Sequence, residues 1–356
     1  MDQDLSFLER LLEEPGPSGF ETRPARVWRE EAASFAERVW SDVHGNSFAA
    51  VGEGRRPRVM LAGHMDEIGL QVTHVDKEGF LYVDGIGGWD SQVLVGQRIR
   101  ILARAGDIPG VMGKKPIHLM KPEERKKVTE LQDLWVDVGA SSAEEVAELG
   151  IRVGDPAVLA SGFLRLAGDR IASRAIDNRV GAFVVLEALR LLARDPAEHA
   201  GCVAVGTVQE EIGYTGGGAR SSAFALEPEV ALVVDVTFAT DVPDISKKEV
   251  GEHNLGGGPV LSRGSATHPL VFDRLVEVAE AEKIPFSLQA QPRSTRTDAD
   301  GIFMVRAGIP TGLISIPNRY MHSPSEVVSV EDLRRAAQIL AGFVRALDPE
   351  TSFVID

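Results

Sequence analysis

Apolar residues recur at helical spacing in several stretches of the chain. A spacing of three to four residues places their side chains on one face of a helix. These stretches are residues 4–14, 24–40, 179–195, 269–283 and 330–347. Ser329 is followed three residues later by Asp332, a pair close to a capping box, and this predicts where the last of these helices begins.

Between these stretches lie short runs that are apolar almost throughout. They are residues 59–62, 202–208, 230–234 and 312–316. Continuous apolarity indicates strands that are buried on both faces, as in a parallel-rich sheet covered by helices. The pattern therefore predicts an α/β fold with a parallel-rich mixed sheet.

Residues 69–166 differ from the rest of the chain. Their apolar residues alternate with polar ones in short pieces such as QVTHV and RIRILAR, which Gly, Pro and Asp interrupt. This pattern is typical of a small antiparallel barrel or sandwich. We expect a catalytic α/β domain made of residues 1–68 and 167–356, interrupted by a β-rich domain of residues 69–166.

Composition excludes several classes of function. With 44% hydrophobic and 26% charged residues, the 356-residue chain has the composition of a globular protein of two domains. A net charge of −15, with the one basic cluster at residues 114–127 interrupted by Glu and Pro, disfavours nucleic acid as a partner.

No apolar run is long enough to cross a membrane, and the acidic first residues lack signal-peptide features, so we expect a cytoplasmic protein. The single cysteine, Cys202, lies in an apolar run and is expected to be buried.

Polar residues with metal-binding or acid–base chemistry gather at the ends of the predicted strands. The candidates are His64, Asp66, Asp177, Glu210, Glu211, Asp235 and His322. All but Asp177 lie at or just past the carboxyl end of a predicted buried strand, where open α/β sheets place their ligand sites. Asp177 lies in the turn that opens a predicted helix.

Each candidate alone has an ordinary explanation. Asp177 could be a helix N-cap, and the paired glutamates could be a solvated strand end. Asp235 is harder to explain in this way, because the sequence VVDV buries a carboxylate that needs a partner or a metal. Taken together, two histidines and several carboxylates without cysteine suit zinc, cobalt or manganese in a hydrolytic site. Two metals need a shared carboxylate, for which Asp177 is the candidate.

Five motifs, GHMDEIG, RAIDNRVG, VQEEIGYTGG, VVDVT and MHSPSE, follow one another along the chain. In this order they resemble the glutamyl and deblocking aminopeptidase family whose members build tetrahedral (TET) assemblies, and the similarity runs from the first helix to the last. The resemblance implies the dinuclear zinc peptidase fold and a metal-dependent aminopeptidase that acts on peptides. It also implies two divalent metal ions per subunit. His64, Asp177 and Asp235 would bind one ion, and Asp177, Glu211 and His322 the other.

The same resemblance assigns the remaining candidates. Glu210 would be the general base that takes a proton from the metal-bridging water, and only the family pattern separates its role from that of Glu211. Asp66 would orient His64, which also fits the rule that residues two apart in a strand point the same way. The glycines of residues 213–218 either let the backbone approach the site or form a plain turn.

For residues 69–166 the resemblance implies self-association, as the dimer contact within a dodecamer. The spacing supports the family, since carboxypeptidases and amidases with similar sites carry their second domain between the residues that match Asp235 and His322. The alternatives are a metal-dependent deacylase or amidase acting on N-acyl amino acids, a glycosidase, and a scaffold protein that has lost its ligands. The sequence leaves the preferred N-terminal residue and the native metal open.

Overall fold

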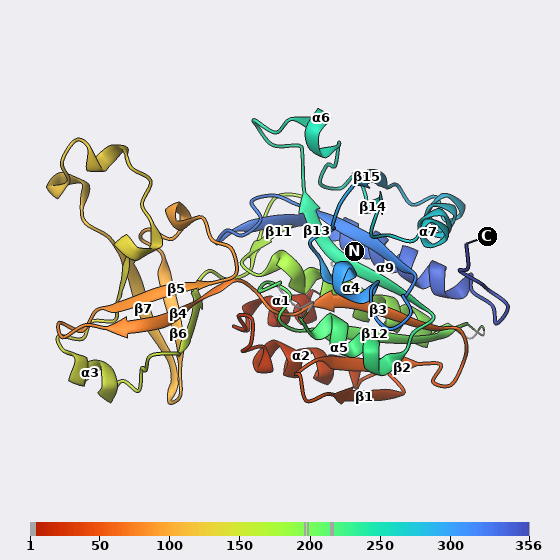
Figure 1. Cartoon of the computed structure of the whole chain (residues 1–356), viewed down its shortest axis with the longest axis horizontal. Helices are drawn as coiled ribbons and strands as arrows, with labels where there is room; N and C mark the ends of the chain where they lie inside the picture. The colour runs from red at the N-terminus through yellow and green to blue at the C-terminus, as the bar shows by residue number, and fades with distance from the viewer. Residues whose placement is uncertain (1–4, 196, 198, 214–216, 356) are drawn as a thin grey trace.

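In the computed structural model, which describes residues 5–195, 197, 199–213 and 217–355, an eight-stranded mixed sheet forms the largest layer (Figure 1). In spatial order its strands are β1 (Arg38–Ser41), β2 (Ser47–Val51), β12 (Gly201–Thr207), β3 (Arg58–His64), β13 (Val230–Phe238), β16 (Thr311–Asn318), β14 (Val260–Gly264) and β15 (Ser287–Gln291). The central strands β12, β3, β13 and β16 are parallel, whereas β2 and β14 pair with them antiparallel.

The four apolar runs of the sequence form this parallel centre, so the predicted α/β class is confirmed. One strand is longer than expected. β13 continues to Phe238 because Val236 and Thr237 also pair with β16. Asp235 consequently lies inside β13 rather than at its carboxyl end.

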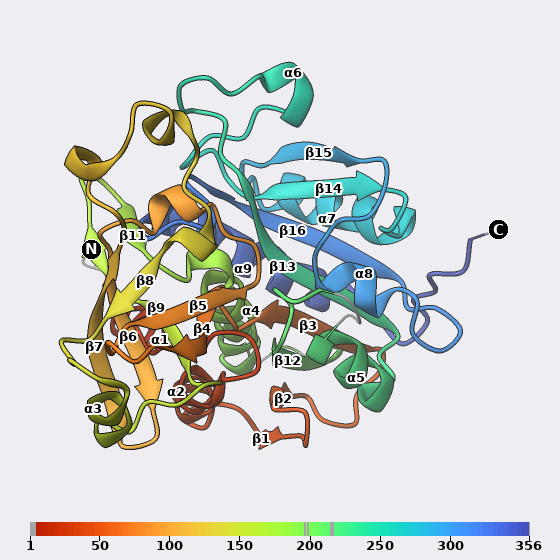
Figure 2. The same ribbon diagram turned by 60° about the vertical axis from the view of Figure 1, so that its left-hand side comes forward.

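Helices cover both faces of the sheet (Figure 2). One face packs against α1 (Ser6–Glu13), α2 (Thr22–Ala32), α4 (Ile176–Ala193), α7 (Pro269–Ala281) and α9 (Val330–Arg345). The other face packs against α5 (Gly217–Leu226) and α8 (Asp298–Ile302). Adjacent residues of β3 show the division, because Leu61 packs with the first group and Met60 with the second.

The helix expected over residues 24–40 is wrong in its second half. α2 ends at Ala32, and the chain returns as the edge strand β1, which pairs antiparallel with β2. The ring of Trp40 in β1 stacks on that of Phe48 in β2, with centroids 5.0 Å apart. This tertiary contact outweighs the helical spacing of the apolar residues.

The predicted start of the last helix is confirmed, because α9 begins at Val330, but the capping-box hydrogen bonds do not form. Ser329 is the N-cap residue but its side chain makes no cap hydrogen bond; its hydroxyl donates to Asp169 Oδ2 at 2.5 Å. Asp332 accepts hydrogen bonds from the backbone N–H groups of Gly256 and Gly258. Both polar side chains therefore bind neighbouring segments instead of their own helix.

Six strands of the insertion close into a barrel, seen on the left of Figure 1. In order around the barrel they are β4 (Gly69–Val75), β5 (Leu81–Ile86), β8 (Trp135–Asp137), β7 (Gly106–Gly113), β6 (Arg98–Ala103) and β9 (Pro156–Leu159). The barrel has its own apolar core, which includes Leu70, Leu81 and Ile99. Of the two β architectures expected for this segment, the barrel is the one that forms.

A three-stranded sheet links the barrel to the α/β layers. It consists of β10 (Leu164–Arg165), β11 (Arg170–Ser173) and β17 (Glu326–Ser329). Because β11 and β17 pair antiparallel, the segment before α4 lies beside the segment that follows β16.

The remaining helical elements are short. They are α3 (Ala143–Glu148), α6 (Lys247–Val250) and 3-10 turns at Ser91–Val93, Ile117–Leu119, Glu124–Lys126 and Leu131–Asp133. Within the described residues, no helix has the length and apolarity that crossing a membrane requires.

Candidate metal and active site

The sequence-predicted residues meet at one edge of the parallel strands. His64 is the last residue of β3, Glu210 and Glu211 follow β12, Asp235 lies in β13, and His322 follows β16. Asp177 joins them from the start of α4, where the backbone at Asp177 and Asn178 departs from helical geometry. The Asp177 carboxylate does not cap α4, which has no side-chain cap; it faces the two histidines.

His64, Asp177 and Asp235 form the first cluster. His64 Nε2 lies 3.3 Å from Asp177 Oδ1 and 3.9 Å from Asp235 Oδ1. One potential ligand atom of each residue lies within 4.8 Å of the others, and all three residues are buried. An imidazole and two carboxylates at this spacing can hold a divalent metal ion.

Asp177, Glu211 and His322 form the second cluster. His322 Nε2 lies 3.4 Å from Asp177 Oδ2 and 3.3 Å from Glu211 Oε1. Glu211 Oε1 is buried and has no hydrogen-bond partner among the described residues, as expected for an oxygen that binds a metal. Asp177 belongs to both clusters and directs one carboxylate oxygen into each.

The electrostatics of the site favour a bound cation. Burial raises the pKa of Glu210 well above its usual range; His64 opposes this rise and Asp235 adds to it. Burial likewise raises the pKa of Asp235 well above its usual range, and Asp177 contributes. Burial lowers the pKa of His322, but Asp177 and Glu211 outweigh it and raise that pKa to about 11. Crowded buried carboxylates need positive charge, which divalent ions would supply. The residues therefore fit a metal centre.

Glu210 is outside both clusters but adjoins them. Its Oε2 lies 3.7 Å from His64 Nε2. With Glu211 it lines a cavity of about 700 Å³ that also includes Arg220, Arg296 and Asp298. Glu210 therefore borders both the first cluster and a space of the size that ligand sites usually have.

Asp66 holds several parts of the site at once. Its Oδ1 lies 3.3 Å from His64 Nδ1, and its carboxylate accepts hydrogen bonds from the backbone N–H groups of Glu210 at 3.1 Å and Glu211 at 3.0 Å. Ser18 Oγ donates to it at 2.5 Å. Strand alternation does not explain the contact with His64, because β3 ends at His64 and Asp66 lies beyond it. The sequence did not indicate that Asp66 would also bind the backbone of Glu210 and Glu211.

Glu326 is a site residue that the sequence analysis missed. Its buried carboxylate accepts hydrogen bonds from the backbone N–H of Asp177 at 2.9 Å and of His322 at 2.8 Å. It thereby ties together one residue shared by both clusters and one from the second. The available signal was a glutamate opening the otherwise apolar segment EVVSV, directly after MHSPS.

A buried ion cluster supports the loop that carries Asp66. Glu67 accepts hydrogen bonds from Arg174, from Arg179 Nη2 at 2.8 Å and from the backbone N–H of Gly16 at 2.9 Å. Arg179 also donates to backbone carbonyls, including that of Leu11 at 3.0 Å. The cluster therefore fixes the β3–β4 loop against α1 and α4.

Of the glycines at residues 213–218, those within residues 214–216 lie outside the described part of the chain. A Cβ atom on Gly217 would lie 2.6 Å from the carbonyl oxygen of Gln209. At this position, glycine allows a close approach to the segment that carries Glu210.

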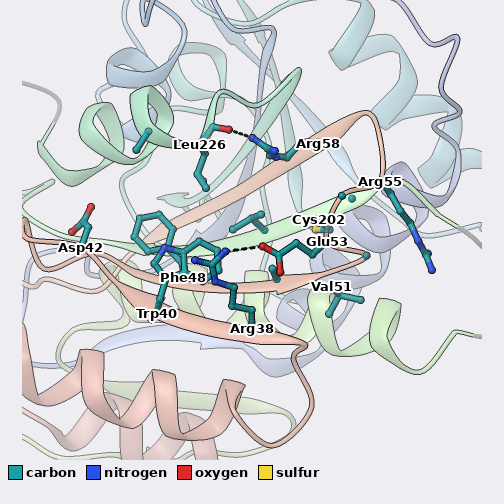
Figure 3. Close-up of a pocket in the computed structure, with 16 residues that line it drawn as sticks. Arg38, Trp40, Asp42, Phe48, Val51, Glu53, Arg55, Arg58, Cys202 and Leu226 are labelled. Atoms are coloured by element: carbon teal, nitrogen blue, oxygen red, sulfur yellow. Dashed lines mark hydrogen bonds and ion pairs between the residues drawn. The ribbon is translucent and has the colours of Figure 1, made fainter.

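A second cavity, of about 290 Å³, lies at the opposite end of the strands (Figure 3). Its lining includes Arg58, the first residue of β3, whereas His64 is the last. Arg38 Nη1 in its wall donates to Glu53 Oε1 at 2.7 Å. Cys202 also lines it and is buried as expected, and burial raises the pKa of its thiol. None of the candidate site residues reaches this cavity.

The chain is similar to known aminopeptidases over nearly its whole length. The profile of the M42 glutamyl aminopeptidase family matches residues 45–339. The lysyl aminopeptidase of Pyrococcus furiosus is 37% identical over 348 residues, which make up 97% of this chain and 98% of that protein.

Solved structures agree with these sequence matches. A TET aminopeptidase from the marine sediment archaeon Thaumarchaeota archaeon SCGC AB-539-E09 is 36% identical over 97% of each chain, with a TM-score of 0.92. The TET1 peptidase of Pyrococcus horikoshii, which can assemble into a tetrahedron or a large octahedral shell, is 30% identical. That comparison has a TM-score of 0.84 and covers 96% of this chain and 99% of the other.

The family match includes every candidate residue from His64 to His322, and the relatives are matched over the α/β layers and the inserted barrel alike. The resemblance noted from the five motifs is thus confirmed over the whole chain. The chain belongs to the M42 glutamyl aminopeptidase family and is an aminopeptidase.

Proposed function

We infer that this aminopeptidase removes N-terminal residues from peptides with the help of two divalent metal ions, one held by each cluster. The observation that carries this inference is the Asp177 carboxylate, with Oδ1 3.3 Å from His64 Nε2 and Oδ2 3.4 Å from His322 Nε2. A carboxylate that faces two ligand sets in this way is suited to bridging two ions. When bound, such ions lower the pKa of a shared water and polarise the scissile carbonyl.

The protein's own residues supply the proton transfers and the positioning. Glu210 borders the cavity beside the first cluster and is placed to accept the proton of the attacking water and return it to the leaving amine. Asp66 orients His64 and holds the backbone of Glu210 and Glu211 in place. A carboxylate behind a ligating imidazole sets its tautomer and raises its basicity.

Zinc, cobalt and manganese all suit this ligand set, with zinc the first choice for a hydrolytic site without cysteine. Chelation should abolish activity, and adding back one of these ions should restore it. Full activity in a protein shown by elemental analysis to be metal-free would disprove the metal mechanism.

The cavity beside Glu210 is the proposed binding site for the peptide. Its lining combines two arginines with four carboxylates: Arg220, Arg296, Glu210, Glu211, Asp298 and Asp300.

A single panel of substrates tests these points. Free-amino and N-acylated forms of glutamyl, leucyl and lysyl peptides would be compared by kcat/KM. We expect the free-amino forms to be cleaved. Faster cleavage of N-acylated substrates would instead favour the deacylase or amidase alternative.

Residues 69–166 are the proposed self-association domain, forming dimers that build a dodecamer. Relatives such as TET1 of Pyrococcus horikoshii assemble into large shells. Several apolar side chains of this segment are exposed and would be covered by a second copy: Val111, Ile117, Leu119 and Val128. A cytoplasmic location is also part of the proposal, and cell fractionation would test it.

A further inference from the structure

A loop of the barrel reaches the second cluster. After β5 ends at Ile86, the chain passes His322, and the carbonyl oxygen of Gly88 lies 3.0 Å from His322 Nδ1. Metal-binding histidines usually donate their second ring N–H to a carbonyl or carboxylate, which fixes the tautomer. With its Nδ1–H donated to Gly88, His322 directs Nε2, the nitrogen that would bind the ion, toward Asp177 and Glu211.

The loop is held firmly in this place from both sides. Trp89 Nε1 donates to the carbonyl oxygen of Gly69 at 2.6 Å, which anchors the loop to the first barrel strand. Gly87 has φ +77°, and a Cβ atom there would lie 2.6 Å from Ile68 Cγ2 and 3.5 Å from Glu211 Cβ. The backbone at Gly87 therefore packs directly against the segment before β4 and against one ligand of the second cluster.

The two clusters obtain their orientation from different parts of the molecule. His64 in the first cluster is oriented by Asp66, two residues away in the loop that follows β3. His322 in the second cluster is oriented by Gly88, which is 234 residues away in sequence and belongs to the inserted barrel. The orientation of His322 therefore depends on the position of the barrel, whereas that of His64 depends on the loop after β3.

We propose that residues 87–89 are a positioning segment through which the barrel completes the second metal site. The barrel then serves as more than a contact surface between subunits, because its backbone selects the tautomer and ring orientation of His322. This proposal rests on the proposed role of His322 as a metal ligand. It predicts that displacing the loop weakens one metal site and spares the other.

Two glycine variants of the full-length protein provide a matched test. Gly87→Ala introduces a Cβ that meets Ile68, whereas Gly96→Ala is in the same barrel, has the same φ of +77° and finds nothing within 4 Å. Both variants suffer the same backbone strain, so only the first moves the loop. Metal-depleted protein would be titrated with Zn²⁺ by calorimetry, with thermal unfolding measured in parallel.

We expect Gly87→Ala to weaken one of the two zinc sites about 10–100-fold, the usual effect of losing a partner behind a ligand, with the other site unchanged. Gly96→Ala should bind both ions as the unaltered protein does. Equal zinc binding by Gly87→Ala and the unaltered protein, or equal losses in the two variants, would overturn the proposal. Failure of the unaltered protein to bind zinc, cobalt or manganese would instead refute the metal mechanism itself.

If Gly87→Ala does not fold, a tryptophan variant tests the positioning role of residues 87–89. Trp89→Phe retains an aromatic ring but removes the N–H that binds Gly69. It should weaken the same zinc site, whereas Trp40→Phe in the edge strand β1 should not. Unchanged zinc binding in Trp89→Phe under these conditions would exclude the positioning role.

Discussion

At the scale of single residues, two adjacent glutamates meet different surroundings. The backbone N–H groups of both bind Asp66, but their side chains diverge. Glu211 Oε1 lies 3.3 Å from His322 Nε2 in the second cluster, whereas Glu210 lies beside His64 at the cavity. Different neighbours give the same side chain different chemistry.

Replacing each glutamate by glutamine separates these functions. Glu210→Gln should lower kcat by at least about 10²–10⁴-fold with both metals retained, because glutamine has the shape of glutamate but cannot accept a proton. Glu211→Gln should instead lose occupancy of one metal site, since a neutral amide is a poor ligand. Steady-state kinetics with elemental analysis measures both effects. If Glu210→Gln loses a metal while Glu211→Gln keeps both, the roles are reversed.

Glu326 should matter for metal binding although it belongs to neither cluster. In Glu326→Gln one of the two accepting oxygens becomes an NH₂ group that faces a backbone N–H, of Asp177 or His322. We expect metal affinity to fall about 10–100-fold, as for other residues that support ligands. Calorimetric titration would measure the affinity, with exposed Glu78→Gln as the control. Unaltered affinity would mean that Glu326 only stabilises the fold.

At the scale of elements, the site depends on how closely α4 approaches β3. Gly63 lies next to His64, and a Cβ atom there would be 2.5 Å from the carbonyl carbon of Gly181 in α4. The first cluster takes His64 from the end of β3 and Asp177 from the start of α4. The spacing of strand and helix therefore sets the distance between the His64 and Asp177 side chains.

Gly63→Ala should push strand and helix apart. Because the obstacle is backbone, we expect a loss of about 1–3 kcal/mol in the free energy of unfolding, typical of overpacking, together with weaker metal binding. Gly162→Ala is the control, since its nearest neighbour is Glu13 Oε1 at 3.8 Å. Denaturant unfolding of the two variants side by side measures the difference. Equal stability of both would show that α4 can shift without cost.

At the scale of the whole molecule, the barrel both touches the site and presents apolar side chains outward. The loop after β5 reaches His322, while Ile117 and Leu119 lie exposed in the connection between β7 and β8. A subunit contact at this surface would lie on the same domain that contacts His322.

Charged substitutions on this surface should reduce the assembly. The double change Ile117→Asp and Leu119→Asp would place two carboxylates in a surface that we expect another copy to cover, and burying them unpaired is costly. Light scattering should then report a smaller particle. Val43→Asp, at a fully exposed position outside the barrel, should leave the size unchanged. A double variant with the full particle size would show that subunits meet elsewhere.

The sequence by itself determined the central strands, the separate β-rich insertion and the set of polar residues at the strand ends. Apolar periodicity reports burial directly, because side chains alternate in strands and recur every three to four residues in helices. Parallel strands bring their carboxyl ends to one edge, so residues as distant as His64 and His322 could be expected together. The local order of the motifs was sufficient to indicate the family.

Only the tertiary structure decided what depends on contacts between distant segments. It ended α2 at Ala32 because Trp40 stacks on β2, which no spacing along the helix could reveal. It placed Glu326 beneath two site residues and the Gly88 carbonyl behind His322. A backbone carbonyl has no sequence signature, and a buried carboxylate gains its function only from the N–H groups that surround it. The physical reason is that periodicity records which side chains are buried, whereas the partner of each buried polar atom is chosen by the three-dimensional packing.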